Sequence, residues 1–342
     1  MPIALDATYS VGESLSGVGL YSREILLGLA LAHPEERFWY CFRPHRRFRA
    51  FGAMPSNARR RLIYEPLMPR GSALFHGLNQ RLPRMALRRA VATFHDLFVI
   101  TGEYSTPEFR ARFTEQARDA AERCDLIVAV SEFTKQQVVE LLGAPAAKVR
   151  VVRHGVRPLA YPAVSRERIV FSAGAIQKRK NIERLVEAFE SLEPSWSLVL
   201  AGSFGYGGER IRSRIEASPA RARIRTLGYV APEELAAWYA RAAIFAFPSL
   251  DEGFGMPVLE AMAGGAAVLT SNRSALPEVA GDAAMLVDPT RTGELVESLR
   301  TLAADEELRR TLARRGLERA RLFTWENAAR ETWDVYRELL GR

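Results

Sequence analysis

Short runs of apolar residues alternate along the chain with longer segments whose apolar positions recur every three to four residues. Runs of four to seven residues bounded by turn-forming residues predict buried strands, and the longer segments predict amphipathic helices. Strands are predicted at 38–42, 90–94, 126–130, 149–152, 168–174, 197–202, 243–249 and 266–271, after a first buried strand within 1–10. Helices are predicted at 20–32, 107–123, 132–142, 181–190, 232–241, 257–264 and 291–303.

This alternation predicts an α/β protein in which helices cover both faces of parallel sheets. The units are too numerous for one six-stranded sheet, and 342 residues suit two domains at roughly 100–200 residues each. Residues 154–167 carry two prolines and little periodicity, so they predict a linker. We therefore expect two doubly wound, Rossmann-like domains, over 1–160 and 161–324.

The C-terminal segment 325–342 predicts one more helix, with Thr324 as its N-cap. Its expected apolar stripe consists of Trp325, Ala328, Trp333, Tyr336 and Leu340. This helix either closes the second domain or returns to the first.

The net charge of +8 arises entirely in the first half of the chain. Residues 1–160 hold 23 basic and 15 acidic side chains, whereas 161–342 hold 25 of each. Within 37–89, 13 arginines face one acid, Glu65. Such asymmetry indicates an anionic partner, which can be nucleic acid, lipid or a phosphorylated substrate. The alternative explanation is a solvated, arginine-rich surface encoded by a GC-rich genome.

Several classes of protein are disfavoured. No apolar stretch reaches the 18 or so residues that a membrane-spanning helix needs, and the N-terminus lacks the pattern of a signal peptide. The two cysteines, Cys41 and Cys124, lie far apart without CxxC spacing, which disfavours a disulfide framework or a zinc site. We expect a cytoplasmic protein.

The segment 247–260 contains the strongest candidate site. Glu252 and Glu260 lie eight residues apart, on either side of a glycine-rich turn and the start of a predicted helix. Backbone amides at such a helix start favour an anionic ligand. The amides expected to face it belong to Gly253, Phe254, Gly255 and Met256. A glutamate accepts hydrogen bonds from sugar or ribose hydroxyls.

A basic turn in 171–189 is the second candidate. Lys178, Arg179 and Lys180 follow a predicted strand, and Asn181 is the expected N-cap of the next helix. Arginine and lysine at the carboxyl end of a strand can neutralise a diphosphate.

Two further candidates lie in the first half. Gly17 and Gly19 open a helix after the first strand, although Ser22 breaks the GxGxxG pattern of dinucleotide-binding folds. His95 and Asp96 directly follow a strand. No second His-Asp pair or histidine cluster accompanies them, so we expect no metal site.

The segment 249–289 resembles the signature region of glycosyltransferase family 4, whose members are retaining enzymes with the GT-B fold, two Rossmann-like domains facing across a cleft. Glu252 and Glu260 match the family's Glu-x7-Glu motif, and 174–181 resembles its G-x4-R-K-N element. The resemblance covers nearly the whole chain and is best between 168 and 290. Ala175 stands where some members carry another arginine.

The resemblance implies a nucleotide diphosphate sugar as donor substrate, with neither a metal nor a separate cofactor. It implies that Arg179 and Lys180 hold the diphosphate with the amides of Gly17 and Gly19, and that His95 lies near the donor sugar. Glu260 would bind the ribose. Glu252 would bind the sugar or act as a nucleophile, and we favour binding. The backbone expected against the base belongs to Gly228, Tyr229 and Val230. His154 stands where the family commonly has asparagine and is a weak candidate.

We expect GDP-mannose as donor, because the segment after the glutamates resembles mannosyl-type enzymes of bacterial surface polysaccharide synthesis; UDP-hexoses and UDP-GlcNAc remain open. The acceptor is expected to be a saccharide or lipid-linked. Residues 43–51 and 82–90 interleave arginines with apolar side chains, which suits peripheral binding to the anionic inner face of the plasma membrane.

Three other functions compete. A nucleotide-sugar epimerase of the same fold is one, and a Rossmann oxidoreductase, disfavoured by the incomplete glycine fingerprint, is another. A basic protein that binds nucleic acid or membrane without catalysis is the third, although aromatic RNA-binding motifs are missing. We expect no nucleic acid partner.

Overall fold

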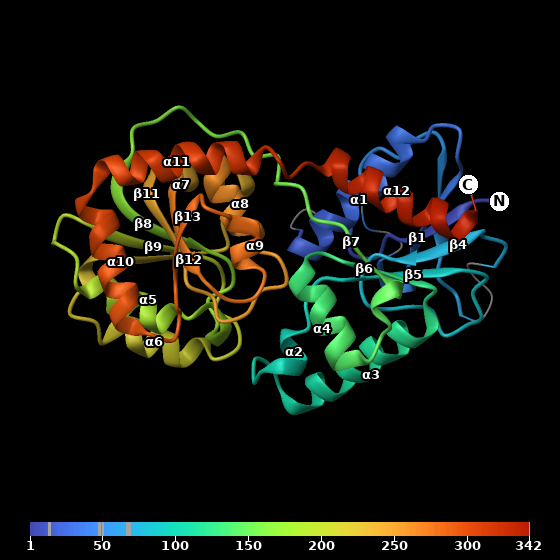
Figure 1. Ribbon diagram of the computed structural model, residues 1–342, viewed down its shortest axis with the longest axis horizontal. Coiled ribbons are helices and arrows are strands. Elements are labelled where there is room, and N and C mark those ends of the chain that lie inside the picture. Colours follow the sequence, from blue (N-terminus) through green and yellow to red (C-terminus); the bar gives the residue numbers. More distant parts are fainter. Residues whose placement is uncertain (13–14, 47–48, 50, 66–69, 342) are drawn as a thin grey trace. The chain divides into compact units, whose positions relative to one another are not determined.

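The computed structural model describes residues 1–12, 15–46, 49, 51–65 and 70–341. Figure 1 shows two α/β parts. One, which we call the N-terminal unit, contains Met1–Thr101, Thr106–Gly155 and Phe323–Arg342. The other, the C-terminal unit, contains Gly102–Ser105 and Val156–Leu322. Residues 152–166, between the last strand of one sheet and the first of the other, form neither helix nor strand.

The N-terminal unit is built on a seven-stranded sheet in the order β3-β2-β1-β4-β5-β6-β7. Its strands, all parallel, are β1 (Ile3–Asp6), β2 (Phe38–Phe42), β3 (Ala58–Leu62), β4 (Leu74–Gly77), β5 (Ala90–Phe94), β6 (Leu126–Ala129) and β7 (Val149–Val151). Its helices are α1 (Gly17–Ala32), α2 (Phe98–Thr101), α3 (Pro107–Arg123), α4 (Glu132–Leu142) and α12 (Trp325–Leu340).

The C-terminal unit is built on a six-stranded parallel sheet in the order β10-β9-β8-β11-β12-β13. Its strands are β8 (Glu167–Ala173), β9 (Ser197–Ala201), β10 (Ile224–Gly228), β11 (Ala242–Phe247), β12 (Ala267–Ser271) and β13 (Ala284–Val287). Its helices are α5 (Ile182–Glu190), α6 (Gly208–Glu216), α7 (Pro232–Arg241), α8 (Met256–Ala263), α9 (Leu276–Ala280), α10 (Thr292–Ala304) and α11 (Glu306–Ala320). The predicted fold class, two doubly wound Rossmann-like domains, is therefore confirmed.

The last helix returns to the N-terminal unit and packs on α1 (Figure 1). The two helices approach so closely that a Cβ on Gly28 would lie 2.9 Å from that of Ala329. Thr324 caps α12 as predicted, because its side chain accepts from the amide of Asn327. The predicted apolar stripe is wrong in part, since Trp333 is only half-buried and stacks on the His33 ring, at 3.8 Å between centroids.

Candidate functional site

In the C-terminal sheet, successive strands are added outward on one side from β8 to β10 and on the other side from β11 to β13, so the strand order reverses between β8 and β11. Open α/β sheets bind ligands at the carboxyl ends of the strands beside such a switch point. The basic turn after β8 and the glutamate loop after β11 meet there. Their backbones are joined, because the amide of Leu250 donates to the carbonyl of Arg179 at 2.8 Å. Ser249 Oγ lies 3.1 Å from the same carbonyl oxygen.

Glu252 is the centre of a buried polar cluster that we call the Glu252 cluster. Its Oε1 atom lies 2.7 Å from Arg179 Nη1 and 2.5 Å from Lys180 Nζ. Ser249 Oγ donates to the same oxygen at 2.6 Å. Arg179 Nη1 also donates to the carbonyl of Asp251. The structure thus brings together three of the residues predicted from two separate motifs.

The cluster keeps Glu252 ionised. Burial raises the pKa of its carboxyl, but the charges of Arg179 and Lys180 and their hydrogen bonds outweigh burial and lower that pKa to about 2. Lys180 Nζ also lies 4.3 Å from the centroid of the Phe247 ring, which favours the cation. Both basic side chains are therefore held as cations at the switch point.

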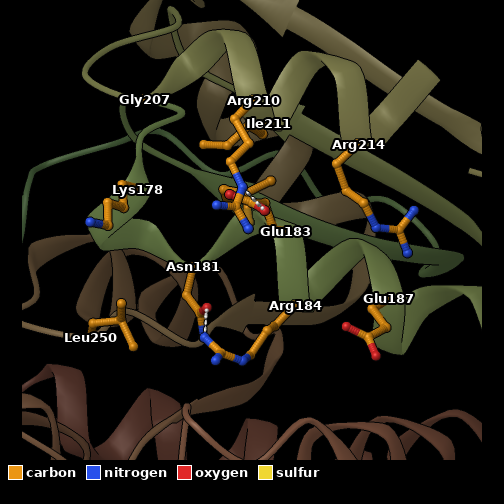
Figure 2. A pocket seen from close by; sticks show the side chains of 11 residues that line it. Lys178, Asn181, Glu183, Arg184, Glu187, Gly207, Arg210, Ile211, Arg214 and Leu250 are labelled. Carbon is orange, nitrogen blue, oxygen red and sulfur yellow. Dashed lines mark hydrogen bonds and ion pairs between the residues drawn. The ribbon is translucent and has the colours of Figure 1, made fainter. Parts of the chain in front are cut away.

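The three basic residues of the turn do not share one environment. Lys178 lines a cavity of about 470 Å³ between α5 and α6 (Figure 2). That cavity has a mixed lining, in which Arg210 pairs with Glu183 at 2.8 Å. Asn181 occupies the predicted N-cap position of α5, but its side chain donates to the carbonyl of Pro289 at 2.7 Å and does not cap the helix.

Glu260 lies in α8, and protein groups hold both of its carboxylate oxygens. Arg157 Nε lies 2.8 Å from Oε1, and Tyr239 Oη donates to Oε2 at 2.8 Å. Tyr161 Oη donates to the Glu260 backbone carbonyl at 2.9 Å. Burial raises the pKa of the Glu260 carboxyl more than the charge of Arg157 lowers it. The pKa values of the two glutamates are thus shifted in opposite directions, down for Glu252 and up for Glu260.

The turn between the glutamates requires glycine at one position. Gly255, the N-cap of α8, has a φ of 113°, and a Cβ there would lie 2.7 Å from the Leu276 side chain. Met256 is the first helical residue, with Pro257 next to it. Gly253 and Phe254 are buried and directly follow Glu252 in the chain.

The segment predicted to face the base follows β10. Gly228 has a φ of 71°, and its carbonyl accepts from the amide of Gly202 at 2.7 Å. Gly202 in turn touches the backbone of Gly174, where a Cβ would lie 1.9 Å from the carbonyl oxygen. Tyr229 is 63% exposed and Val230 half-buried, which leaves an open surface beside these three loops.

Two family profiles match adjacent parts of the chain. Residues 31–158 match "Glycosyltransferase Family 4", and residues 160–319 match "Glycosyl transferases group 1". The chain belongs to the family 4 glycosyltransferases. It is therefore an enzyme, and the predicted family is confirmed.

Curated relatives of this glycosyltransferase include mannosyltransferases. It is 29% identical to O-antigen chain mannosyltransferase B of Escherichia coli, over 97% of this chain and 99% of the relative. It is 30% identical to serotype-specific mannosyltransferase WbdA of Escherichia coli over 74% of this chain, but only 34% of that relative's length. Among solved structures, sucrose-phosphate synthase from Thermosynechococcus elongatus covers 100% of this chain at a TM-score of 0.81 and 24% identity. That likeness supports the GT-B fold.

The glycosyltransferase carries its other predicted residues in the N-terminal unit. Gly17 begins α1, and the amide of Gly19 donates to the side chain of the N-cap Ser16 at 3.2 Å. That amide, expected to face a phosphate, therefore already has a partner. A Cβ on Gly19 would lie 2.8 Å from the carbonyl oxygen of Tyr9, so packing alone accounts for this glycine.

His95 belongs to a buried group of histidines in the glycosyltransferase, which we call the histidine cluster. Its Nε2 lies 3.0 Å from the carbonyl oxygen of Leu78, and its Nδ1 lies 3.4 Å from His154 Nε2. Because a carbonyl only accepts, Nε2 of His95 carries the proton and Nδ1 accepts. Burial lowers the pKa of His95 to about 4 and that of His154 well below its usual value. Asp96 is half-buried beside them.

A third histidine of this cluster, His76, was not predicted from the sequence. Its Nε2 lies 2.8 Å from Thr93 Oγ1, and its Nδ1 lies 2.5 Å from Tyr336 Oη of α12. Tyr21 Oη lies 2.9 Å from the same threonine oxygen. Burial lowers the pKa of His76 to about 3, so this histidine is neutral as well.

In the C-terminal unit, sequence analysis missed the residues that hold the predicted glutamates. Arg157 lies in the linker, Tyr239 in α7, and Ser249 in the loop before the first glutamate. None of them stands in a motif of its own. The sequence contains one indirect signal for such partners. The glutamates follow an apolar strand, and a carboxylate in an apolar setting requires partners.

Proposed function

We propose that this glycosyltransferase is a retaining hexosyltransferase that moves mannose from GDP-mannose to a hydroxyl of a saccharide or lipid-linked acceptor. The observation that carries the proposal is the Glu252 cluster, which fixes two cations beside the N-terminus of α8. The named mannosyltransferase relatives support the sugar. UDP-hexoses and UDP-GlcNAc are the alternative donors.

In the proposed reaction, negative charge grows on the diphosphate as the bond to the sugar breaks. Arg179, Lys180 and the backbone of the Gly253–Met256 loop stabilise that charge without a metal ion. Both side chains are already oriented by Glu252, so little reorganisation accompanies the reaction. The acceptor attacks on the face from which the diphosphate leaves, and a phosphate oxygen takes the acceptor's proton.

Glu252 serves in this scheme as a binding and orienting group. A carboxyl with a pKa of about 2 is a weak base, and its Oε1 already accepts from three donors. Both properties disfavour it as a general base or as a nucleophile. Its remaining lone pairs are left to bind hydroxyls of the donor sugar.

Glu260 binds the ribose of the donor in this proposal. Tyr239 donates one hydrogen bond to its carboxylate and Arg157 forms an ion pair with it, whereas a carboxylate offers about four acceptor positions. Two positions remain for the ribose diol. The charge of Arg157 lowers the pKa of the Glu260 carboxyl and so favours the ionised, hydrogen-bond-accepting form, although burial raises that pKa more.

The acceptor and cellular location also belong to the proposal. No helix in the described part of the chain is long and apolar enough to cross the bilayer. We propose a cytoplasmic enzyme that attaches peripherally to the inner face of the plasma membrane through 82–90 and 43–51. Residues 47–48 and 50 of the second stretch lie outside the described residues.

The test is a donor panel with GDP-mannose, UDP-glucose and UDP-GlcNAc. The purified chain is incubated with each donor and a mannose-terminated acceptor, released nucleotide is measured, and the product anomer is assigned by NMR. We expect release from GDP-mannose above that from the UDP-sugars and an α-linked product from the α-linked donor. Inversion at the anomeric carbon, or release from none of the donors, would contradict the proposal.

A further inference from the structure

The N-terminal unit contains a second concave site, whose lining overlaps the stretches 43–51 and 82–90 that are proposed above to bind a membrane. It is a cavity of about 1160 Å³ between the ends of β2 and β3, the loop that joins β4 to β5, and one face of α3. Five guanidinium groups line it, and we call it the arginine groove: Arg43, Arg81, Arg84, Arg112 and Arg123. Because these arginines come from three separate segments, the fold brings them together around one space.

Three carboxylates also line the groove and leave it positive. Asp119 pairs with Arg123 at 2.9 Å, and Glu65 lies 3.8 Å from Arg43 Nη1. The third is Glu115. Within the described part of the chain, no carboxylate lies within 4.0 Å of the guanidinium groups of Arg81, Arg84 or Arg112. The groove thus holds an excess of two positive charges, with three guanidinium groups available to a ligand.

Arg43 gives the groove a buried donor. Its side chain is only 11% exposed, and Nε and Nη2 have no hydrogen-bond partner among the described residues. Buried polar atoms without partners are rare, because losing their water costs about 1–3 kcal/mol each, and more for a charged group. Arg43 therefore adds to the groove a positive charge that the described protein groups satisfy only in part.

The lining also selects the kind of anion. Guanidinium groups bind phosphate oxygens through paired, parallel hydrogen bonds. Ile63, Leu82 and Met85 line the same cavity, and its volume exceeds what one phosphate fills. An extended ligand with more than one negative charge and an apolar portion therefore matches the groove better than a free phosphate.

We propose that the arginine groove binds the diphosphate of a lipid-linked acceptor. The assignment of this ligand as acceptor rests on the proposed function, whereas the anion site follows from the groove's own geometry. A phospholipid headgroup carries related chemistry, so the experiment compares a diphosphate with a vesicle surface.

The experiment titrates inorganic pyrophosphate into the full chain by calorimetry at constant ionic strength, with GDP and UDP present to fill the donor site. The double variant Arg81→Gln/Arg84→Gln changes two exposed groove residues. Its control, Arg59→Gln/Arg118→Gln, removes the same charge from exposed positions of the same unit outside the groove. We expect one pyrophosphate per chain, binding weakened at least tenfold in the groove variant, and a change below twofold in the control.

Binding of geranyl diphosphate and of phosphatidylglycerol vesicles is measured in two further experiments on the same variants. We expect geranyl diphosphate to bind more tightly than pyrophosphate and to lose affinity in the groove variant. Equal losses in both double variants, or a groove variant that loses only vesicle binding, would overturn the proposal. Binding of GDP or UDP to the wild-type chain is measured separately, so failure of the proposed function is recognised independently of failure at the groove.

Discussion

The two units bury polar groups in different ways. In the histidine cluster of the N-terminal unit, His76, His95 and His154 are neutral and bonded to hydroxyls, a carbonyl and each other. In the Glu252 cluster of the C-terminal unit, a carboxylate is buried between two cations. Burying charges is costly even in pairs, and hydrophobic residues often do as well for stability. From this difference we predict that the neutral cluster maintains the fold and that the charged cluster serves the chemistry proposed above.

The largest expected effect is a loss of stability when the negative charge of Glu252 is removed. Glu252→Gln leaves Arg179 and Lys180 buried without a countercharge, so we expect a loss of roughly 3–5 kcal/mol in unfolding free energy. Urea unfolding followed by tryptophan fluorescence measures it. The control is Glu183→Gln, whose partner Arg210 is 83% exposed, and its loss should stay within about 1 kcal/mol. Equal losses in the two variants would show that the Glu252 cluster is not held by charge.

The next effect concerns turnover. Lys180→Met removes one of the two cations proposed to stabilise the diphosphate, and kcat/KM for the donor should fall by about 10²–10³. Lys178→Met is its neighbour-matched control, because Lys178 lines a different cavity. We expect that control to remain within about threefold of wild type. If both lysine variants lose the same activity, Lys178 and Lys180 act together, and the different roles expected for them are wrong.

The neutral cluster predicts a pH effect on stability. The folded-state pKa values of His76 and His95, about 3 and 4, lie below the unfolded value near 6.5. The unfolded chain therefore binds more protons as the pH falls from 6.5 to 4, and the N-terminal unit loses stability over that range. Glu252 stays ionised there, and the raised pKa of Glu260 favours the folded C-terminal unit as it protonates.

Hydrogen exchange at pH 7 and pH 5 measures this contrast, after correction for the intrinsic rates. Protection should decrease in β4 and β5 and remain in β8 and β11. His154→Asn should reduce the pH dependence, whereas the exposed His45→Gln should leave it unchanged. Parallel loss of protection in both units would contradict the assignment of the pH effect to the histidine cluster.

The smallest expected effect concerns Arg157. In Arg157→Met, the buried carboxyl of Glu260 loses the charge that counteracts burial, so its pKa rises further. Nucleotide affinity should fall by about tenfold at pH 7, and the loss should become smaller at higher pH, because higher pH favours the ionised carboxylate of Glu260. Arg153→Met, an exposed neighbour in the linker, is the control. A loss of affinity that does not change with pH would mean that Arg157 contacts the ligand instead of tuning Glu260.

The sequence predicted the elements whose apolar pattern is strong and missed those whose pattern is weak. The strand β3 contains three consecutive arginines, because it lies at a sheet edge where charge prevents pairing with another chain. The strand β4 has four residues, and α11 has a polar surface with few buried positions. Buried strands such as β11 and helices such as α3 were placed almost to the residue.

The candidate site shows a similar division. The motif identified Glu252, Arg179 and Lys180, because their spacing reflects loops that meet at one edge of the sheet. It did not show that Glu260 is paired with Arg157, since the two residues are 103 positions apart and no pattern links them. Likewise, His76 gave no signal, because its partner Tyr336 lies 260 positions away.

The bond between His76 and Tyr336 has a consequence for synthesis. The helix α12 follows every strand of the C-terminal unit along the chain, so it leaves the ribosome after all of them. The N-terminal unit therefore stays incomplete until the C-terminal unit has been made, and until then the face of α1 that receives α12 is uncovered. Nascent chains of this enzyme should depend on chaperones most strongly between the emergence of β7 and that of α12.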